Sequence, residues 1–237
     1  MRTKEFLGKH NIPFLSRNVL TDAGAVEELQ ALGTRQLPVI ARGKDWVNGQ
    51  SLKEIARLVG IDLGSLKHLP PQELVRRIDV VLDGAARFFA QFPEHRLGDQ
   101  LPGRPRSYAQ LAWHLFNVVD AFLEHEAGIP LATTAYNRVP AADMTRPEIL
   151  AYGADVRRRF NEWWQTANGR TDWNDKARVY YGDVSRHEFL ERTTWHAGQH
   201  SRQLMWVLED KFQIAPERPI DPATWQGLPM PEKVWDS

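Results

Sequence analysis

Three capping-box motifs, each followed by an amphipathic stretch, constrain the fold of this chain more than any other feature of its sequence. The motifs are Ser107-Tyr-Ala-Gln110, Thr145-Arg-Pro-Glu148 and Ser185-Arg-His-Glu188. In such a motif the first and fourth side chains exchange hydrogen bonds with backbone amides at a helix start. A further helical stretch opens with Pro70-Pro71, because proline suits the first helical turn. These signals predict helices over about residues 70–92, 107–127, 146–167 and 186–211, which together predict a four-helix bundle.

Residues 1–62 follow a different pattern, in which short helix and strand signals alternate. Helices are expected at about residues 3–10, 22–32 and 51–59, and strands at 13–19 and 37–40, the second followed by a turn at 42–45. Alternation of this kind is typical of an α/β layer. We therefore expect two domains, an α/β lobe over residues 1–64 and a helical bundle over residues 68–237 that ends in a proline-rich tail.

Composition excludes several functional classes. Thirty basic residues balance thirty acidic ones, which argues against nucleic-acid or acidic-membrane partners. The chain has no cysteine, and this excludes disulfides, thiolate metal sites and cysteine nucleophiles. The apolar runs are too short for a membrane span, and the start lacks a signal peptide, so we expect a cytoplasmic protein.

Two histidines, His196 and His200, lie four residues apart in the last predicted helix. This spacing places both imidazoles on one helix face, about 6 Å apart at Cβ, where they can share a metal ion. The alternative is that both are merely polar helix residues. A metal site therefore needs a third ligand from another helix at the same height.

His114 in the second bundle helix is the candidate third ligand. It lies about 10 Å from the start of a helix of about 30 Å, whereas His196 and His200 lie about 16 and 22 Å along theirs. If the two helices are antiparallel, His114 falls between the other two. The connection over residues 128–143 is long enough to cross the bundle from end to end, which predicts up-down-down-up order and antiparallel helices. Three imidazoles suit Zn, Ni, Fe or Mn, and the spacing does not choose among them.

With this triad and the tail Leu228–Trp235, residues from about 68 to 235 resemble the DinB-like superfamily of four-helix metal-binding proteins. Members with assigned reactions include bacillithiol transferases and mycothiol-dependent maleylpyruvate isomerase. The resemblance implies a divalent-metal-dependent S-transferase or isomerase that acts on a small electrophile, with a low-molecular-weight thiol as cosubstrate. It also implies pairing as a homodimer.

Residues 1 to about 62 resemble a glutaredoxin. The pieces that carry this resemblance are Lys4–Leu7, Ile12–Phe14 and Gly33–Val39. In that family the proline that corresponds to Pro38 is cis, and its loop faces the bound thiol. Here the first strand and the cysteine motif are missing, so redox chemistry is excluded. The segment is then a degenerate thiol-binding lobe, an interaction module or the remainder of a mis-assigned start. The predicted fold class is therefore α+β, with a small glutaredoxin-like lobe followed by an up-down-down-up, DinB-like bundle.

Two further residues are candidates for catalysis. Arg192 lies one turn before His196 and could hold a carboxylate of the substrate, or form a salt bridge with a neighbouring helix. Asn117 lies one turn after His114 and could orient a ligand, or satisfy buried backbone. Gln203 continues the face of His200 with the same two alternatives. Arg157-Arg158-Arg159 is expected to be a solvated face with local ion pairs.

Three functions remain open on this evidence. The first is the metal-dependent thiol S-transferase or isomerase. The second is a non-catalytic metal-binding stress or interaction protein that uses its N-terminal lobe for docking. The third is a hydrolase that activates water on the metal, with the same three histidines as ligands.

Overall fold

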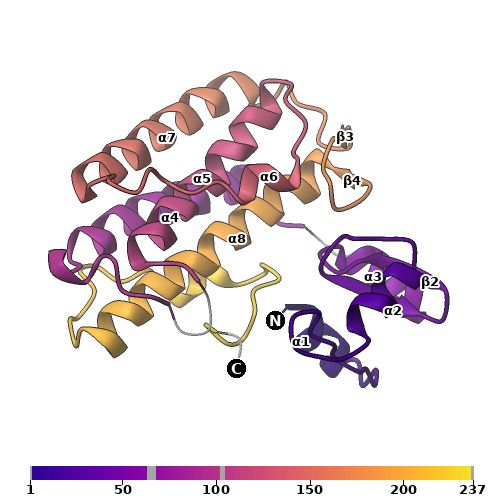
Figure 1. The fold of residues 1–237 in the computed structure, drawn as a ribbon. Coiled ribbons are helices and arrows are strands. Elements are labelled where there is room, and N and C mark those ends of the chain that lie inside the picture. Colours follow the sequence, from indigo (N-terminus) through magenta and orange to yellow (C-terminus); the bar gives the residue numbers. More distant parts are fainter. Residues whose placement is uncertain (1, 63–67, 102–104, 236–237) are drawn as a thin grey trace. The chain divides into compact units, whose positions relative to one another are not determined.

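The computed structural model describes residues 2–62, 68–101 and 105–235. The chain divides into two compact units, Met1–Lys67 and His68–Ser237, which we describe separately (Figure 1). Within the described residues, no helix combines the length and the apolar character needed to cross a lipid bilayer.

The N-terminal unit contains short helices and a β-hairpin, against which α3 packs. Its elements are α1 (Arg2–Lys9), α2 (Ala25–Ala31), β1 (Val39–Arg42), β2 (Asp45–Asn48) and α3 (Leu52–Val59). The two strands are antiparallel, with Val39 opposite Asn48. Ser51 caps α3, because its Oγ accepts a hydrogen bond from the amide of Glu54. The peptide bond between Leu37 and Pro38 is cis.

The strand expected over residues 13–19 is absent, and this prediction was wrong. The segment has no regular structure, and Phe14 and Leu15 are 45 % and 80 % exposed. A strand requires a backbone partner, and among the described residues β1 pairs only with β2. The N-terminal unit thus holds a two-stranded sheet, and its resemblance to glutaredoxins stays a prediction.

The second unit contains the bundle of four long helices. They are α4 (Pro71–Ala90), α5 (Tyr108–Glu126), α7 (Arg146–Ala167) and α8 (Arg186–Trp206). Ser107 and Ser185 form complete capping boxes, and at the start of α7 the Glu148 carboxylate accepts from the Thr145 amide at 2.7 Å. The fourth helix was expected to continue to residue 211. Instead α8 gives way to a π-helical turn, Val207–Lys211.

The bundle has the predicted up-down-down-up order. α4 packs chiefly against α7 and α8, and α5 packs against the same two helices (Figure 1). α5 and α8 are antiparallel, since His114 meets His200 whereas Phe122, further along α5, meets Phe189 near the start of α8. α5 and α7 are parallel, as shown by the contacts Trp113–Tyr152 and Phe122–Phe160. α4 and α7 are antiparallel, as shown by the hydrogen bonds Arg157–Asp79 and Arg146–Phe92.

Short elements fill the connections between the helices. The crossover from α5 to α7 contains the helix α6 (Thr133–Tyr136), and the 3-10 helix η1 (Glu94–Arg96) follows α4. A hairpin of β3 (Lys176–Ala177) and β4 (Val184–Ser185) precedes α8. No strand was expected after His68, so this hairpin corrects the prediction. Strands of two residues are too short to show the alternation of polar and apolar residues by which strands are recognised.

The C-terminal tail returns along α4 and α8. It contains the 3-10 helix η3 (Pro222–Trp225). Glycines on the helices let the tail approach closely, because a Cβ on Gly84 would lie 2.7 Å from Cδ1 of Ile220. Near the end of the chain, the rings of Trp206 and Trp235 lie 5.4 Å apart. The tail therefore belongs to the packed structure of the bundle.

Candidate metal centre

Three imidazoles meet between α5 and α8. One ring nitrogen from each of His114, His196 and His200 lies within 4.8 Å of those of the other two. The ring centroids are 5.7 Å apart for His114–His196, 4.9 Å for His114–His200 and 5.0 Å for His196–His200. Imidazoles that bind one ion at about 2 Å hold their nitrogens about 4 Å apart or less, so only small ring rotations are needed. The antiparallel arrangement of α5 and α8 brings the three histidines together, as predicted from their distances along the helices.

Burial keeps the His196 imidazole suited to metal binding, and His114 lies among buried neighbours. His114 is 5 % exposed, and its neighbours Leu115 and Phe116 are buried. Burial, with the positive charge that His200 and Arg192 can carry nearby, holds the pKa of His196 well below its usual value. A neutral imidazole offers a lone pair to a metal, whereas a protonated one does not.

The surroundings of one ring nitrogen are better explained by a metal site than by a polar residue in the core. The Nδ1 atom of His196 is buried, and the described part of the chain offers it no hydrogen-bond partner. A buried polar atom without a partner costs about 1–3 kcal/mol, so such atoms are rare in native proteins. Coordination of a metal ion by the cluster would give this buried imidazole a binding partner.

His200 is held by Gln203. Its Nδ1 atom lies 2.7 Å from Oε1 of Gln203, while Nε2 of Gln203 donates to the carbonyl of Val234 at 3.1 Å. Because that amide nitrogen faces a carbonyl, the amide oxygen faces His200 and accepts the Nδ1 proton. In this tautomer Nε2 of His200 carries no proton, so it is the nitrogen that can bind a metal.

Arg192 lies beside the cluster among aromatic rings. Its guanidinium carbon is 4.2 Å from the ring centroid of Tyr181 and 5.4 Å from that of Trp195. The ring of Tyr136 lies 5.2 Å from that of His196, and burial raises the pKa of Tyr136 to about 12, with Arg192 opposing the rise. The position of Arg192 near the histidines was predicted from the sequence. The positions of Tyr136, from α6, and Tyr181, from the loop between β3 and β4, were not.

Asn117 is fully buried and holds the backbone of α6. Its Nδ2 atom donates to the carbonyl of Ala135 at 2.8 Å. The structure thus shows Asn117 bound to backbone, and its role in orienting a ligand stays a prediction. Because Tyr136 follows Ala135 directly, this hydrogen bond also fixes the ring next to His196.

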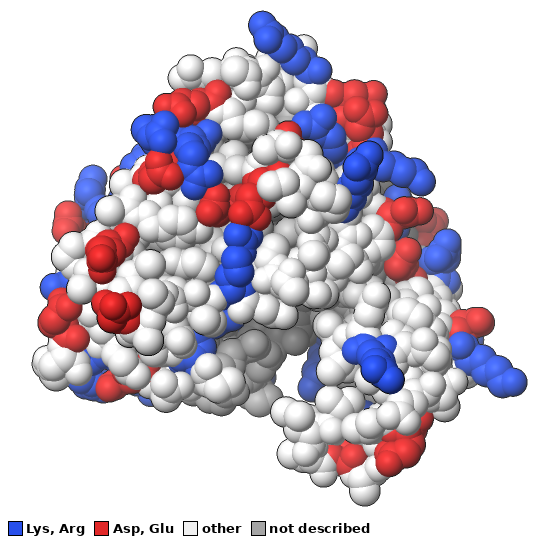
Figure 2. Space-filling model, turned by 45° about the horizontal axis from the view of Figure 1, so that its top comes forward, with Lys and Arg blue, Asp and Glu red and all other residues white. Residues whose placement is uncertain are grey.

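The acidic residues of α5 do not form a second metal site among the described residues. Each of them is bound to an arginine, in the pairs Asp120–Arg159, Glu124–Arg138 and Glu126–Arg186. The three successive arginines of α7 are likewise paired, in the contacts Arg157–Asp79, Arg158–Glu162 and Arg159–Asp155. Figure 2 shows basic and acidic side chains interspersed on the face that it presents, as expected for local ion pairs.

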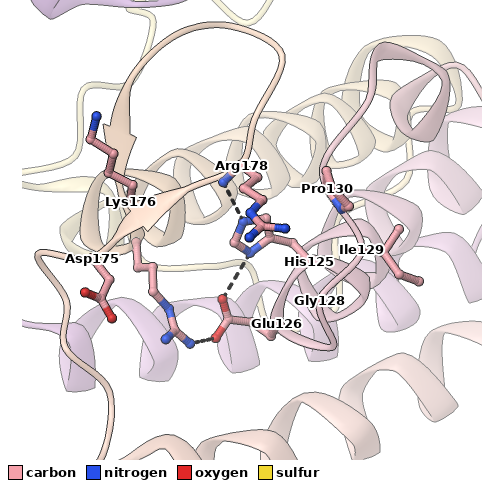
Figure 3. Close-up of a pocket in the computed structure, with 9 residues that line it drawn as sticks. His125, Glu126, Gly128, Ile129, Pro130, Asp175, Lys176 and Arg178 are labelled. Atoms are coloured by element: carbon pink, nitrogen blue, oxygen red, sulfur yellow. Dashed lines mark hydrogen bonds and ion pairs between the residues drawn. The ribbon is translucent and has the colours of Figure 1, made fainter.

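A hollow of about 400 Å³ lies at the other end of α5, and sequence reasoning missed it (Figure 3). At its base, Nδ1 of His125 lies 3.2 Å from Oε1 of Glu126, and Nε2 of His125 accepts from the amide of Arg178 at 3.0 Å. Arg186 and Trp163 both donate to Oε2 of Glu126. Both ring nitrogens of His125 thus make hydrogen bonds, and the contacts of His125 and Glu126 connect α5 with α7 and α8.

The N-terminal unit has a larger, mostly apolar groove of about 770 Å³. It is lined by α1, α2, β1 and the extended segment that contains Phe14, Leu15 and Arg17. Leu37 and Pro38 also line it, and Leu37 is 52 % exposed.

Comparison with known proteins bears on the second unit. The family model described as the DinB superfamily matches residues 63–204, which include the three histidines. Residues 1–62 lie outside this match. Among curated proteins, no match to the sequence was found.

Proposed function

The chain belongs to the DinB superfamily, and from this premise we propose that it is a divalent-metal-dependent enzyme whose ligands are His114, His196 and His200. The superfamily is typically metal-binding. The observation that carries the proposal is the meeting of three ring nitrogens within 4.8 Å of one another. Three protein ligands are typical of catalytic sites, which keep a position for water or substrate.

The proposed reaction is transfer of a low-molecular-weight thiol to a small electrophile, or isomerisation of that electrophile with the thiol. A divalent ion at this cluster would lower the pKa of a thiol or water bound to it. Arg192 would hold a carboxylate of the substrate or cosubstrate, since its planar guanidinium suits bidentate binding. The rings of Tyr136, Tyr181 and Trp195 would keep the reacting groups away from bulk water.

Metal analysis tests the first part of the proposal. Untagged protein should hold about one ion of Zn, Ni, Fe or Mn per chain, whereas His114→Ala and His196→Ala should lose it and keep their helical circular dichroism. The matched control is His95→Ala, because His95 is exposed and outside the cluster. Wild-type protein that stays without metal after reconstitution would disprove the site.

Product analysis tests the reaction. A metal-loaded protein that consumes thiol and electrophile together, or isomerises the electrophile only when thiol is present, supports the proposal. Turnover without thiol would instead favour the hydrolase, in which the same cluster activates water. Arg192→Lys should raise KM for carboxylate substrates more than it lowers kcat, because lysine keeps the positive charge but cannot make the two parallel hydrogen bonds of a guanidinium.

A second candidate function is peptide docking by the N-terminal unit, without catalysis. The observation that favours it is the apolar groove beside the open edge of β1, where an extended apolar peptide could add as a strand. The full-length chain should enrich such peptides from a displayed library, and the Phe14→Asp variant should not enrich them. A library with no enrichment over a mock selection would count against docking.

A further inference from the structure

We propose that the C-terminal segment, residues 231–235, raises the metal affinity of the histidine cluster, and that Gln203 transmits this effect as a positioning residue. The inference rests on the proposed function, since it concerns the same metal. It assigns a role to a tail that neither the histidine spacing nor the family match, which ends at residue 204, accounts for.

The relay consists of two hydrogen bonds that share one buried amide. His200 donates from Nδ1 to Oε1 of Gln203 at 2.7 Å, and Gln203 donates from Nε2 to the Val234 carbonyl at 3.1 Å. Gln203 is only 7 % exposed, so water has little access to replace either bond. Loss of the Val234 carbonyl would allow the amide to turn and present its nitrogen to His200.

Three more side chains of α8 hold the segment in place. Gln199 donates to the carbonyls of Lys233 and Val234 at 3.2 and 2.7 Å. Arg202 donates to the carbonyls of Pro231 and Glu232 at 2.6 and 2.8 Å, and the ring of Trp206 contacts that of Trp235. Four successive carbonyls therefore accept hydrogen bonds from one helix face, and one of the donors also contacts a histidine of the cluster.

The direction of the effect follows from the tautomer. A ligating histidine binds more tightly when its other nitrogen donates to a fixed acceptor, and loss of such a partner typically costs 10–100-fold in metal affinity. Because coupling is reciprocal, an ion that binds the held form of His200 must also stabilise the docked segment.

Three variants separate the relay from the rest of the tail. Gln203→Leu removes both hydrogen bonds and should weaken Zn²⁺ binding 10–100-fold. Gln203→Glu keeps an acceptor for His200 and loses the donor to Val234, so it should retain affinity within about threefold while loosening the segment. Gln199→Leu is the matched control, since it removes bonds to the segment without contacting His200, and it should cost less than about fivefold.

Two measurements on the full-length chain give the readouts. Competition with a chromophoric chelator measures the Zn²⁺ affinity, and circular dichroism confirms that each variant folds. Trypsin cleavage after Lys233 reports undocking, because it releases residues 234–237 and can be followed by intact mass. Saturating Zn²⁺ should slow this cleavage in the wild type and have less effect in Gln203→Leu.

The outcomes are distinct. Wild-type protein that binds no Zn²⁺ would overturn the proposed function, and this inference with it. Tight binding by the wild type with equal affinity in Gln203→Leu would overturn only the relay. The same applies if Zn²⁺ leaves the cleavage rate at Lys233 unchanged in the wild type, because coupling must act in both directions.

Discussion

Gly198 of α8 lies so close to Trp225 of the tail that a Cβ on residue 198 would be 2.9 Å from the Cζ3 atom of that ring. Gly198 lies between the two histidines of α8, so the tail is fitted directly against the helix that carries them. Alanine would gain about 1 kcal/mol of helix propensity but would force the ring to move, at a cost of about 1–3 kcal/mol. We expect Gly198→Ala to lower the free energy of unfolding by about 1 kcal/mol in urea titrations.

A double-mutant cycle checks the cause of that loss. Trp225→Leu removes the outer ring atoms, so Gly198→Ala in that background should be neutral or stabilising by up to about 1 kcal/mol. Equal effects in both backgrounds would mean that the indole does not limit residue 198.

Gly153 of α7 should tolerate alanine even less. A Cβ there would lie 2.5 Å from Cζ of Phe116 and 2.7 Å from each of its Cε atoms. The ring of Phe116 is fully buried in the bundle, so it has no space into which to turn. Gly153→Ala should therefore destabilise the protein by about 2–3 kcal/mol in urea unfolding. A variant as stable as the wild type would show that α5 and α7 can separate easily.

Asn117→Leu should destabilise the protein and leave its metal content unchanged. The substitution removes one of the two side-chain hydrogen bonds to the carbonyl of Ala135, which Arg138 also contacts through Nε at 3.0 Å, so it should cost about 1 kcal/mol. Faster hydrogen exchange should appear in α6, with about one metal ion per chain still present. Loss of the ion from a folded variant would contradict this, and would show that Asn117 acts on the cluster itself.

Features set by local sequence were predictable. Capping boxes at Ser107, Thr145 and Ser185 fixed the starts of three helices because their hydrogen bonds involve only four consecutive residues. The triad followed from helical rise and one crossover, since both depend on counting residues along helices. Together these yielded the up-down-down-up bundle and the juxtaposition of His114 with His196 and His200.

Features that need a distant partner were not predictable. The strand expected over residues 13–19 is absent. Strand propensity favours an extended backbone, but it does not supply the neighbouring strand with which that backbone must pair. Gln203 was recognised as sharing the face of His200, but its bond to Val234 depends on where a tail of irregular structure returns. The hollow beside His125 likewise draws residues from α5 and from the β3–β4 hairpin, which no local pattern connects.

Glu126 provides a pH-dependent test of the other end of the bundle. Burial alone would raise the pKa of this carboxyl, but hydrogen bonds from His125 and Arg186 outweigh burial and hold the pKa below its ordinary value of 4.5. A folded-state pKa below the unfolded value means that the charged form stabilises the fold above about pH 4.5. This contribution is lost as the pH falls through the folded-state pKa.

Glu126→Gln should therefore be less stable than the wild type by about 2 kcal/mol at pH 7, because the half-buried charge of Arg186 loses its carboxylate partner. The difference should begin to shrink below about pH 4.5, where the carboxyl of the unfolded chain takes up a proton, and should be lost as the pH falls through the folded-state pKa. Urea unfolding at a series of pH values measures both effects. Glu162→Gln is the control, since its pair with Arg158 is largely exposed and should contribute less than about 0.5 kcal/mol. A difference between Glu126→Gln and wild type that stays constant from pH 7 to pH 3 would show that the charge of Glu126 does not stabilise the bundle.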